Sequence, residues 1–212
     1  MEQGLRIGID LDNTMINYDA VFFGTAKRAR LIGSAVPRRK HAVRDAIRML
    51  PEGELAWQRL QGQVYGKGIA EAAMATGFKE FLKRCRIEGC AVVVVSHKTE
   101  YGHHDPDHVN LRKAALDWMT AQGLFDGEYG ITQENVYFES TRAEKLCRIA
   151  VLGLTHFIDD LEEVLTDPDF PPNVKRILFA EEVNTHAASN IACSTWLEIE
   201  KRVFGGADFE RS

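Results

Sequence analysis

Two aspartates stand where an apolar stretch near the N-terminus ends. The stretch runs from Leu5 to Leu11, with Asp10 inside its last residues and Asp12 directly after it. Two neighbouring carboxylates repel each other and are costly to desolvate, so such pairs recruit a cation or share a proton. Carboxylate oxygens suit Mg²⁺, which leaves positions for water and for substrate phosphates. The pair therefore indicates phosphoryl chemistry; the competing interpretation is that Asp12 and Thr14 only cap the next helix.

More chemically competent side chains follow apolar stretches later in the chain. The stretch Ala91–Ser96 ends in a hydroxyl, which can bind a phosphate oxygen. Lys145 stands at the start of a helical pattern, where its ammonium can neutralise a phosphoryl group. A third stretch, from His156, ends in Asp159 and Asp160. All of these groups occur at or near the predicted end of a strand.

The alternation of apolar stretches and helical patterns predicts an α/β fold with a doubly wound, Rossmann-like parallel sheet. Leu5–Leu11 and Ala91–Ser96 have the pattern of strands buried on both faces. The carboxyl ends of such strands are where open α/β sheets place ligands. Later elements are a helix near 107–122, a strand near 135–138, a helix near 141–151 and strands near 155–158 and 175–179. A helix near 189–203 should pack on the sheet and leave Gly205–Ser212 as a frayed tail.

A long insertion separates the first two predicted strands. Residues 13–89 far exceed the roughly 10–12 residues of a minimal crossover between parallel strands. Helical patterns near 18–31, 37–49, 54–64 and 78–88 predict a small helical cap, with the last helix returning to the core. We therefore expect a core domain of residues 1–14 and 77–212, with a cap of residues 15–76 inserted after the first strand.

The order of these groups resembles the haloacid dehalogenase-like (HAD) hydrolase superfamily, over about Leu5 to Phe179. The first motif of that family, Asp-x-Asp-x-Thr after a strand, fits Asp10, Asp12 and Thr14. The second motif, a Ser or Thr after a strand, fits Ser96, and the third, a Lys, fits Lys145. The fourth, an acidic pair after a strand, fits Asp159 and Asp160. An aspartate at the second position of the first motif, as Asp12 is here, goes with phosphatases and phosphomutases in this family.

The resemblance implies a role for each of these residues. Asp10 is expected to be the nucleophile, and Asp12 the acid and base. Ser96 and Lys145 are expected to stabilise charge on the transferring group. The expected cofactor is Mg²⁺, held by Asp10, the backbone carbonyl of Asp12, Asp159 and, directly or through water, Asp160. The expected substrate-binding residues are Asn13, Thr14, His97, Lys98 and Arg142, although pairing of Arg142 with Glu139 or Glu144 explains that residue equally well.

Two segments carry further signals. Residues 27–48 contain eight basic residues against one acid, so they carry a charge of +7 in a chain whose net charge is −5. This segment is either a basic lid that attracts an anionic substrate or a solvated helix face. The loop from His97 to His108 contains four histidines and two aspartates. It either contacts substrate, forms a polar surface loop or binds a transition metal.

Composition agrees with one compact enzyme. The chain has 212 residues, of which 45% are hydrophobic and 27% charged, enough to bury a sizeable core. No leader-like segment precedes the first predicted strand and no apolar stretch nears 18 residues, so we expect a cytoplasmic protein without a membrane segment. The acidic balance outside residues 27–48 argues against nucleic acid as a partner.

We expect a Mg²⁺-dependent phosphatase of a small phosphorylated metabolite, with a sugar phosphate favoured. A nucleoside 5'-monophosphate phosphatase, or a non-catalytic phospho-ligand-binding protein of the same fold, is the alternative.

Overall fold

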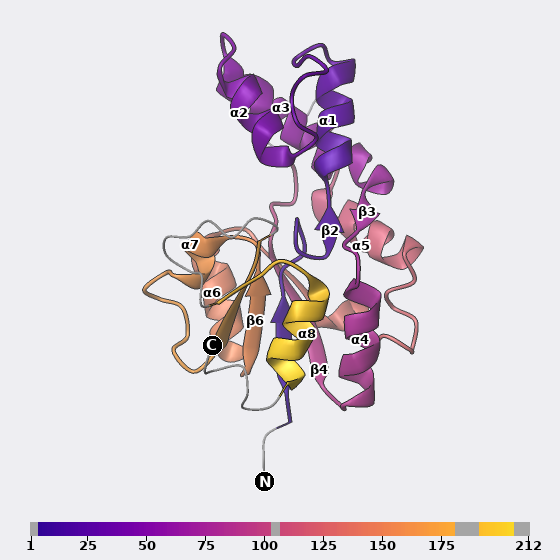
Figure 1. Ribbon diagram of the computed structural model, residues 1–212, viewed down its shortest axis with the longest axis vertical. Helices are drawn as coiled ribbons and strands as arrows, with labels where there is room; N and C mark the ends of the chain where they lie inside the picture. Colours follow the sequence, from indigo (N-terminus) through magenta and orange to yellow (C-terminus); the bar gives the residue numbers. More distant parts are fainter. Residues whose placement is uncertain (1–3, 103–106, 181–190, 206–212) are drawn as a thin grey trace. The chain divides into compact units, whose positions relative to one another are not determined.

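The chain folds into two compact units. The computed structural model describes residues 4–102, 107–180 and 191–205 (Figure 1). One unit, the sheet unit, is formed from residues 1–15, 75–97 and 123–212, and the other, the helical unit, from residues 16–74 and 98–122. The helical unit thus takes in residues 98–122 as well as most of the predicted insertion. The predicted domain boundaries, with a cap of residues 15–76, stay a prediction.

The sheet unit is built on six parallel strands. They are β1 (Arg6–Ile9), β4 (Ala91–His97), β5 (Val136–Glu139), β6 (His156–Asp159), β7 (Lys175–Phe179) and β8 (Ala192–Cys193). Their order is β5-β4-β1-β6-β7-β8, and every pairing is parallel. The chain therefore extends the sheet from β1 toward β4 on one side and toward β6 on the other. This confirms the predicted doubly wound sheet and places β1 at its topological switch point.

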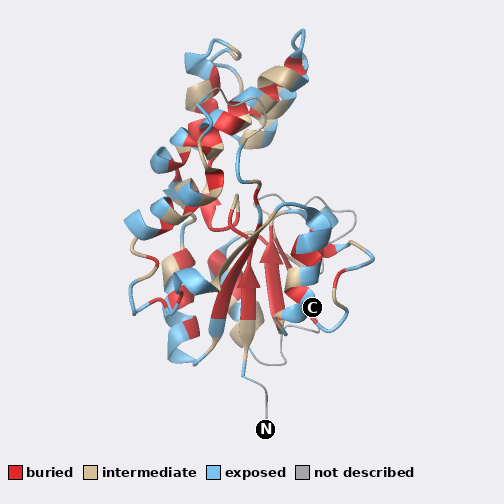
Figure 2. Ribbon diagram, turned by 180° about the vertical axis from the view of Figure 1, so that it is seen from behind, coloured by how far each residue is buried: buried red, intermediate tan, exposed pale blue. Residues whose placement is uncertain are grey.

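Helices cover both faces of this sheet. They are α4 (Phe78–Ile87), α6 (Arg142–Val151), α7 (Glu162–Leu165) and α8 (Trp196–Phe204), with a 3₁₀ turn η2 (Gln133–Asn135) before β5. Leu146 of α6 and Leu165 of α7 share a buried cluster with Val93 and Phe157 of the strands. On the opposite face, Trp196 of α8 packs against aromatic rings of α4 and β7. The middle strands are accordingly buried along most of their length (Figure 2).

The helical unit has an aromatic interior of its own. It contains β2 (Ile16–Asn17), α1 (Asp19–Arg28), α2 (Lys40–Arg48), α3 (Gly53–Tyr65), the 3₁₀ turn η1 (Lys67–Glu71), β3 (Ala73–Met74) and α5 (Leu111–Ala121). β2 and β3 form a two-stranded antiparallel ladder. Phe22 of α1 stacks on Trp57 of α3, with ring centroids 5.0 Å apart. Trp118 of α5 donates from its indole N–H to the carbonyl of Ala72 at 3.0 Å, which ties α5 to this unit. A helical insert after the first strand is thus confirmed.

Two predicted helix starts were wrong. The C-terminal helix begins at Trp196 rather than near 189, because Thr195 caps it by accepting from the backbone N–H of Glu198. Strand β8 lies before it and was not predicted, since two residues are too few for an alternation pattern. Helix α5 begins at Leu111 rather than near 107, because Asn110 is its N-cap. The predicted tail beyond Gly205 lies outside the described residues.

Across the parts of the chain that the structure describes, no helix combines the length and the apolar character needed to cross a lipid bilayer.

Gly8 is required by the packing of β1. A methyl group on its Cα would lie 2.6 Å from a ring carbon of Phe157 and closer still to the side chain of Leu154. We expect Gly8→Ala to lower the free energy of unfolding by about 1–3 kcal/mol, as overpacking of a core does, measured by denaturant titration of the sheet unit's transition. The control is Gly127→Ala, since a methyl group at Gly127 meets nothing within 4 Å. Equal stability of the two variants would contradict this packing.

Candidate active site

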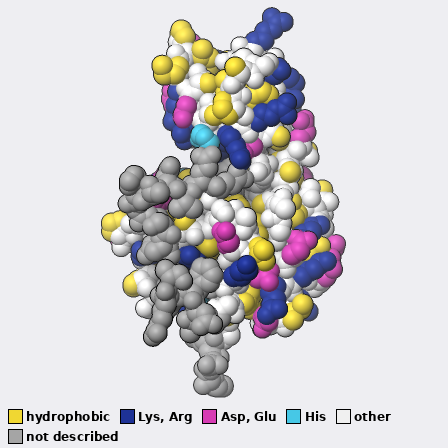
Figure 3. Space-filling view, viewed as in Figure 1, with side chains coloured by type: hydrophobic (Ala, Val, Ile, Leu, Met, Phe, Trp, Pro, Cys, Tyr) yellow, Lys and Arg dark blue, Asp and Glu magenta, His cyan; other side chains and the backbone are white. Residues whose placement is uncertain are grey.

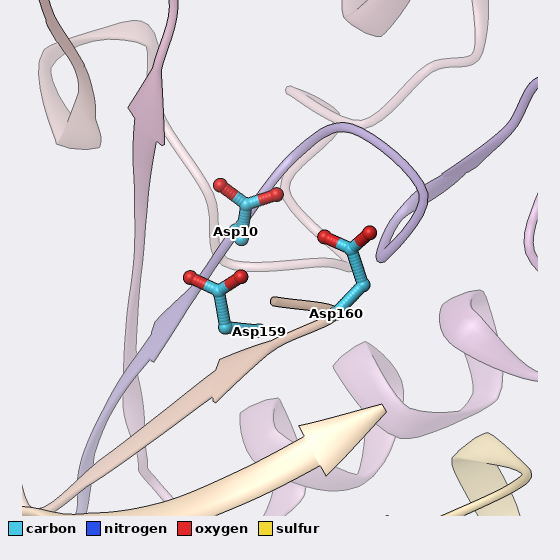
Figure 4. A group of neighbouring side chains, drawn as sticks. All are labelled: Asp10, Asp159 and Asp160. Atoms are coloured by element: carbon cyan, nitrogen blue, oxygen red, sulfur yellow. The ribbon is translucent and has the colours of Figure 1, made fainter. Parts of the chain in front are cut away.

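Three carboxylates meet at the carboxyl edge of the two central strands. Asp10 follows β1 directly, Asp159 is the last residue of β6, and Asp160 comes next. The backbone N–H of Asp10 donates to the carbonyl of Ile158 at 2.8 Å, so the parallel pairing continues as far as the aspartates. One candidate ligand oxygen from each of them lies within 4.8 Å of the other two. Figure 4 shows the three side chains next to one another. Adjacent parallel strands thus bring the first and fourth sequence motifs together.

Lys145 joins two of these carboxylates. Its ammonium donates to Asp10 Oδ1 at 2.6 Å and to Asp159 Oδ2 at 2.6 Å. The side chain of Lys145 is only 1% exposed, and that of Asp159 is fully buried. The contacts are charge-assisted hydrogen bonds shielded from water, which are stronger than those at a surface. The predicted third motif therefore lies against the first and the fourth.

A capping box positions Lys145. The hydroxyl of Thr141 accepts from the backbone N–H of Glu144, and the carboxylate of Glu144 accepts from the backbone N–H of Thr141 at 2.9 Å. This reciprocal pair fixes the first turn of α6, in which Lys145 lies. A cation in the first turn is opposed by the helix dipole. The carboxylates of Asp10 and Asp159 offset that cost.

Burial and the charge of Lys145 have opposite effects on the pKa of Asp10. Burial raises the pKa of Asp10 to about 7, although the ammonium of Lys145 lowers it; the nearby carboxylates of Asp159 and Asp12 raise it further. Burial by itself would lower the pKa of Lys145, but the two carboxylates outweigh burial and raise that pKa above its usual value. Lys145 is therefore charged at neutral pH. One ammonium does not neutralise three carboxylates, so the site favours an additional cation.

The turn after β1 holds the remaining residues of the first motif. Asp12 is half-buried, and Thr14 is fully buried with a hydroxyl that has no hydrogen-bond partner among the residues described. Asn13 adopts a left-handed backbone with φ of 60°, and its amide donates to Asp160 Oδ2 at 3.2 Å. This contact orients Asp160, a role that the sequence did not reveal. Binding of substrate by Asn13 and Thr14 stays a prediction.

Strand β4 contributes its own carboxyl end to this edge. Ser96 is buried near the end of β4, which pairs with β1. The ring of the exposed His97 shares a hydrogen bond of 3.0 Å between its Nε2 and the carbonyl of Ser140. His97 thereby ties β4 to the segment that precedes α6. Lys98 belongs to the helical unit, where it is buried beside the ring of Tyr65.

Arg142 has a different partner from those considered above. Its guanidinium pairs with Glu163 at 3.4 Å, and both side chains are largely exposed. Glu139 instead accepts from Arg148 at 2.7 Å, and Glu144 is part of the capping box. Pairing of Arg142 with Glu139 or Glu144 is therefore wrong. Exposed ion pairs of this kind contribute little to stability, and binding of substrate by Arg142 stays a prediction.

The histidine-rich loop is described only in part. His103, His104 and Asp105 lie outside the described residues. Most of the side chains that could bind a transition metal in this loop are therefore not described, and that alternative stays open. Among the residues that are described, one group of three or more carboxylate, imidazole or thiol side chains is close enough to hold a metal ion, and it consists of Asp10, Asp159 and Asp160.

The donor set suits Mg²⁺. It offers only carboxylate oxygens, the ligands that hard divalent cations prefer. Mg²⁺ binds oxygen at about 2.0–2.1 Å, so ligands on opposite sides of the ion are about 4 Å apart. Oxygens that already lie within 4.8 Å of one another need only a small contraction to reach that separation. The residues present therefore fit a divalent ion.

The comparisons with known proteins give matches in structure alone. No protein-family model matches the sequence, and no curated protein matches it. Solved structures match over nearly the whole chain. A predicted phosphoglycolate phosphatase from Haemophilus somnus 129pt is 16% identical, with a TM-score of 0.57 over 96% of this chain and 99% of that one. A HAD family hydrolase from Deinococcus radiodurans R1, with bound phosphate and sodium, is 12% identical, with a TM-score of 0.53 over 94% and 95%.

This chain has the HAD fold. Structural neighbours that match over nearly their full length include HAD-superfamily hydrolases and a predicted phosphatase. Protein Tyrosine Kinase A of Mycobacterium tuberculosis also matches, at 16% identity and a TM-score of 0.62 over 96% of this chain and 100% of that one. Identities this low show the HAD fold, and they do not transfer an activity. They do confirm the fold that the resemblance to the HAD superfamily implied.

The charge imbalance at the site predicts a link between metal binding and pH. Because the pKa of Asp10 is about 7 in the folded protein and ordinarily near 3.8, the folded state binds more protons between those values. The contribution of Asp10 to the free energy of unfolding therefore falls as the pH rises from about 3.8 to about 7. A bound Mg²⁺ offsets this destabilisation, because its positive charge compensates the ionised carboxylate of Asp10. We expect the rise in Tm that Mg²⁺ gives over chelator to be small at about pH 5.5 and larger at about pH 8.

Two controls isolate this effect. Burial lowers the pKa of His156 to about 4, so His156 makes stability rise with pH below its ordinary value near 6.5. Comparing Mg²⁺ with chelator at each pH cancels that contribution. In Asp10→Asn the pH dependence of the Mg²⁺ shift should largely vanish. A shift of the same size at both pH values in the unaltered protein would refute the link.

Proposed function

We propose that this protein is a Mg²⁺-dependent phosphatase that hydrolyses a small phosphate monoester through an aspartyl phosphate on Asp10. The observation that carries the proposal is the buried contact of Lys145 with Asp10 and Asp159, beside Asp160. A protein that only binds phosphate esters needs positively charged side chains to attract the phosphate. This site instead has three aspartate carboxylates next to a single lysine ammonium. Such an arrangement suits a carboxylate nucleophile with a metal ion next to it.

In the first half of the reaction, a carboxylate oxygen of Asp10 attacks phosphorus. The bond between phosphorus and the ester oxygen breaks, and its electron pair stays on the leaving oxygen. Asp12 gives its proton to that oxygen, so that an alcohol departs. The ammonium of Lys145 neutralises charge at the reacting carboxylate, and the hydroxyl of Ser96 binds an oxygen of the phosphoryl group.

In the second half, water releases the phosphoryl group. Asp12, now ionised, takes a proton from a water molecule while the water oxygen attacks phosphorus. The bond to Asp10 breaks, its electrons return to the carboxylate, and inorganic phosphate leaves. When bound, Mg²⁺ supplies positive charge that favours ionised Asp10 and balances the phosphoryl oxygens. Asp10, Asp159, Asp160 and the backbone carbonyl of Asp12 would hold it.

The proposed substrates are small. Sugar phosphates are the first class to screen, and nucleoside 5'-monophosphates are the second. The structural neighbours of the same fold include a predicted phosphoglycolate phosphatase and a hydrolase with bound phosphate, which agrees with chemistry on small phosphate esters. We propose a cytoplasmic location for such a metabolic enzyme.

Replacement of the nucleophile tests the proposal. In Asp10→Asn the amide keeps the size of the side chain but cannot serve as the attacking oxyanion. We expect turnover of phosphate monoesters to fall at least about 10³-fold, to background, with Mg²⁺ present. The assay is release of inorganic phosphate from a panel of esters, and circular dichroism checks the fold. Asp117→Asn is the matched control, because Asp117 is an exposed partner of Lys113 in the helical unit. Undiminished turnover by well-folded Asp10→Asn would exclude the covalent mechanism.

A further inference from the structure

The charged side chains of this protein lie in two kinds of surroundings. On the surface, Figure 3 shows basic and acidic side chains in blue and magenta. Residues 27–48 contribute four ion pairs between partly or largely exposed side chains: Arg28 with Glu71, Arg39 with Asp19, Arg44 with Asp45 and Arg48 with Glu54. Pairs of this kind contribute little. The carboxylates of the candidate active site are different, because two of them are buried and the third is half-buried.

Each of these three carboxylates accepts a hydrogen bond from a fixed donor. The ammonium of Lys145 donates to Asp10 and to Asp159. The side-chain amide of Asn13 donates to Asp160 Oδ2 at 3.2 Å. Donors of this kind orient a carboxylate toward an ion and are part of a metal site, although they do not touch the ion themselves.

The backbone of Asn13 does not by itself call for an amide side chain. Its φ is 60°, in the left-handed region that glycine adopts most readily and that Asn and Asp tolerate. The turn around it is closed by a hydrogen bond of 3.0 Å from the backbone N–H of Met15 to the carbonyl of Leu11, which involves no atom of residue 13. Glycine would therefore satisfy this turn. What asparagine adds is the donor for Asp160.

The contact matters because Asp160 is less confined than the other two aspartates. Asp10 and Asp159 are 5% and 0% exposed, whereas Asp160 is half-buried. Asp160 also comes after the last residue of β6, so the strand does not fix its backbone. A side chain with more freedom loses more entropy when it is held in one rotamer. A donor that already holds Asp160 lowers that cost when an ion binds.

Mg²⁺ and Ca²⁺ make different demands on such a ligand. Mg²⁺ requires a near-octahedral shell at about 2.0–2.1 Å, whereas Ca²⁺ takes about six to eight oxygens at about 2.3–2.6 Å and accepts both oxygens of one carboxylate. Because Oδ2 of Asp160 is engaged by the amide of Asn13, binding of an ion through both oxygens of Asp160 is disfavoured. Loss of the amide would cost Mg²⁺ a positioned ligand, but it would leave Ca²⁺ a carboxylate that can bind through both oxygens.

We propose that Asn13 is a positioning residue that increases the preference of this site for Mg²⁺ over Ca²⁺, because it holds Oδ2 of Asp160. The inference rests on the proposed function, since that function requires a divalent ion at this site. It goes further by assigning the choice of ion to a side chain outside the group of candidate ligands. Donors in this position typically change metal affinity by about 10–100-fold.

The test measures the binding of each ion without turnover. Calorimetric titration with MgCl₂ and, separately, with CaCl₂ gives the ratio of the two dissociation constants. Asn13→Gly keeps the left-handed backbone and removes the amide, so we expect Kd for Mg²⁺ to rise about 10-fold or more and Kd for Ca²⁺ to rise less than about 3-fold. Asn13→Asp, which replaces the donor with an acceptor and also tolerates a positive φ, should shift the ratio in the same direction.

Two controls accompany these variants. Asn173→Gly removes an exposed amide from the sheet unit and should change neither dissociation constant. Thermal denaturation in chelator checks that each variant folds.

The outcomes separate this inference from the proposed function. If both variants of Asn13 weaken the two ions by the same factor, or change neither, or if the unaltered protein binds neither ion, the inference is overturned. A higher KM for a phosphate ester in Asn13→Gly, with an unchanged ratio of dissociation constants, assigns Asn13 to the substrate and also overturns it. If the protein hydrolyses no ester but both variants shift the ratio toward Ca²⁺, the proposed function fails and the inference stands.

Discussion

The ammonium of Lys145 is the constraint on which the rest of the sheet unit depends, because it holds two buried carboxylates that would otherwise repel. It contacts Asp10 and Asp159 at 2.6 Å each. Removing one partner of such a buried pair typically costs about 3–5 kcal/mol, a large part of the roughly 5–15 kcal/mol by which a domain is stable. The fold therefore has to position all three side chains within contact of one another. Strands β1 and β6 position the carboxylates, and the capping box of α6 positions the lysine.

This constraint explains why the site lies at the switch point of the sheet. Only at β1 does the chain extend the sheet in both directions, so its carboxyl end has β4 on one side and β6 on the other. Gly8 lets β1 approach the side chains of Phe157 and Leu154 that a larger residue would displace. Packing in the middle of the strand thus supports the chemistry at its end.

Local patterns were enough to predict the parallel sheet and the elements that carry the motifs. The apolar residues that precede Asp10 and Asp159 formed two short adjacent strands. Contacts between residues distant in sequence could not be predicted. Asn13 orienting Asp160, and Arg142 pairing with Glu163 across 21 residues, depend on tertiary packing. The capping box was readable from the sequence as Thr141-x-x-Glu144, and it would have fixed the start of α6.

Chemical trapping of the phosphorylated enzyme tests the central claim, that Asp10 is the nucleophile, most directly. The protein is mixed with Mg²⁺ and with a phosphate ester that it hydrolyses, and the reaction is quenched in acid during turnover. The protein is then reduced with borohydride and digested for mass spectrometry. Because borohydride reduces an aspartyl phosphate to homoserine, we predict homoserine at position 10 and none when the ester is omitted. Homoserine at Asp12 or Asp159 instead, or none anywhere during rapid turnover, would contradict the account.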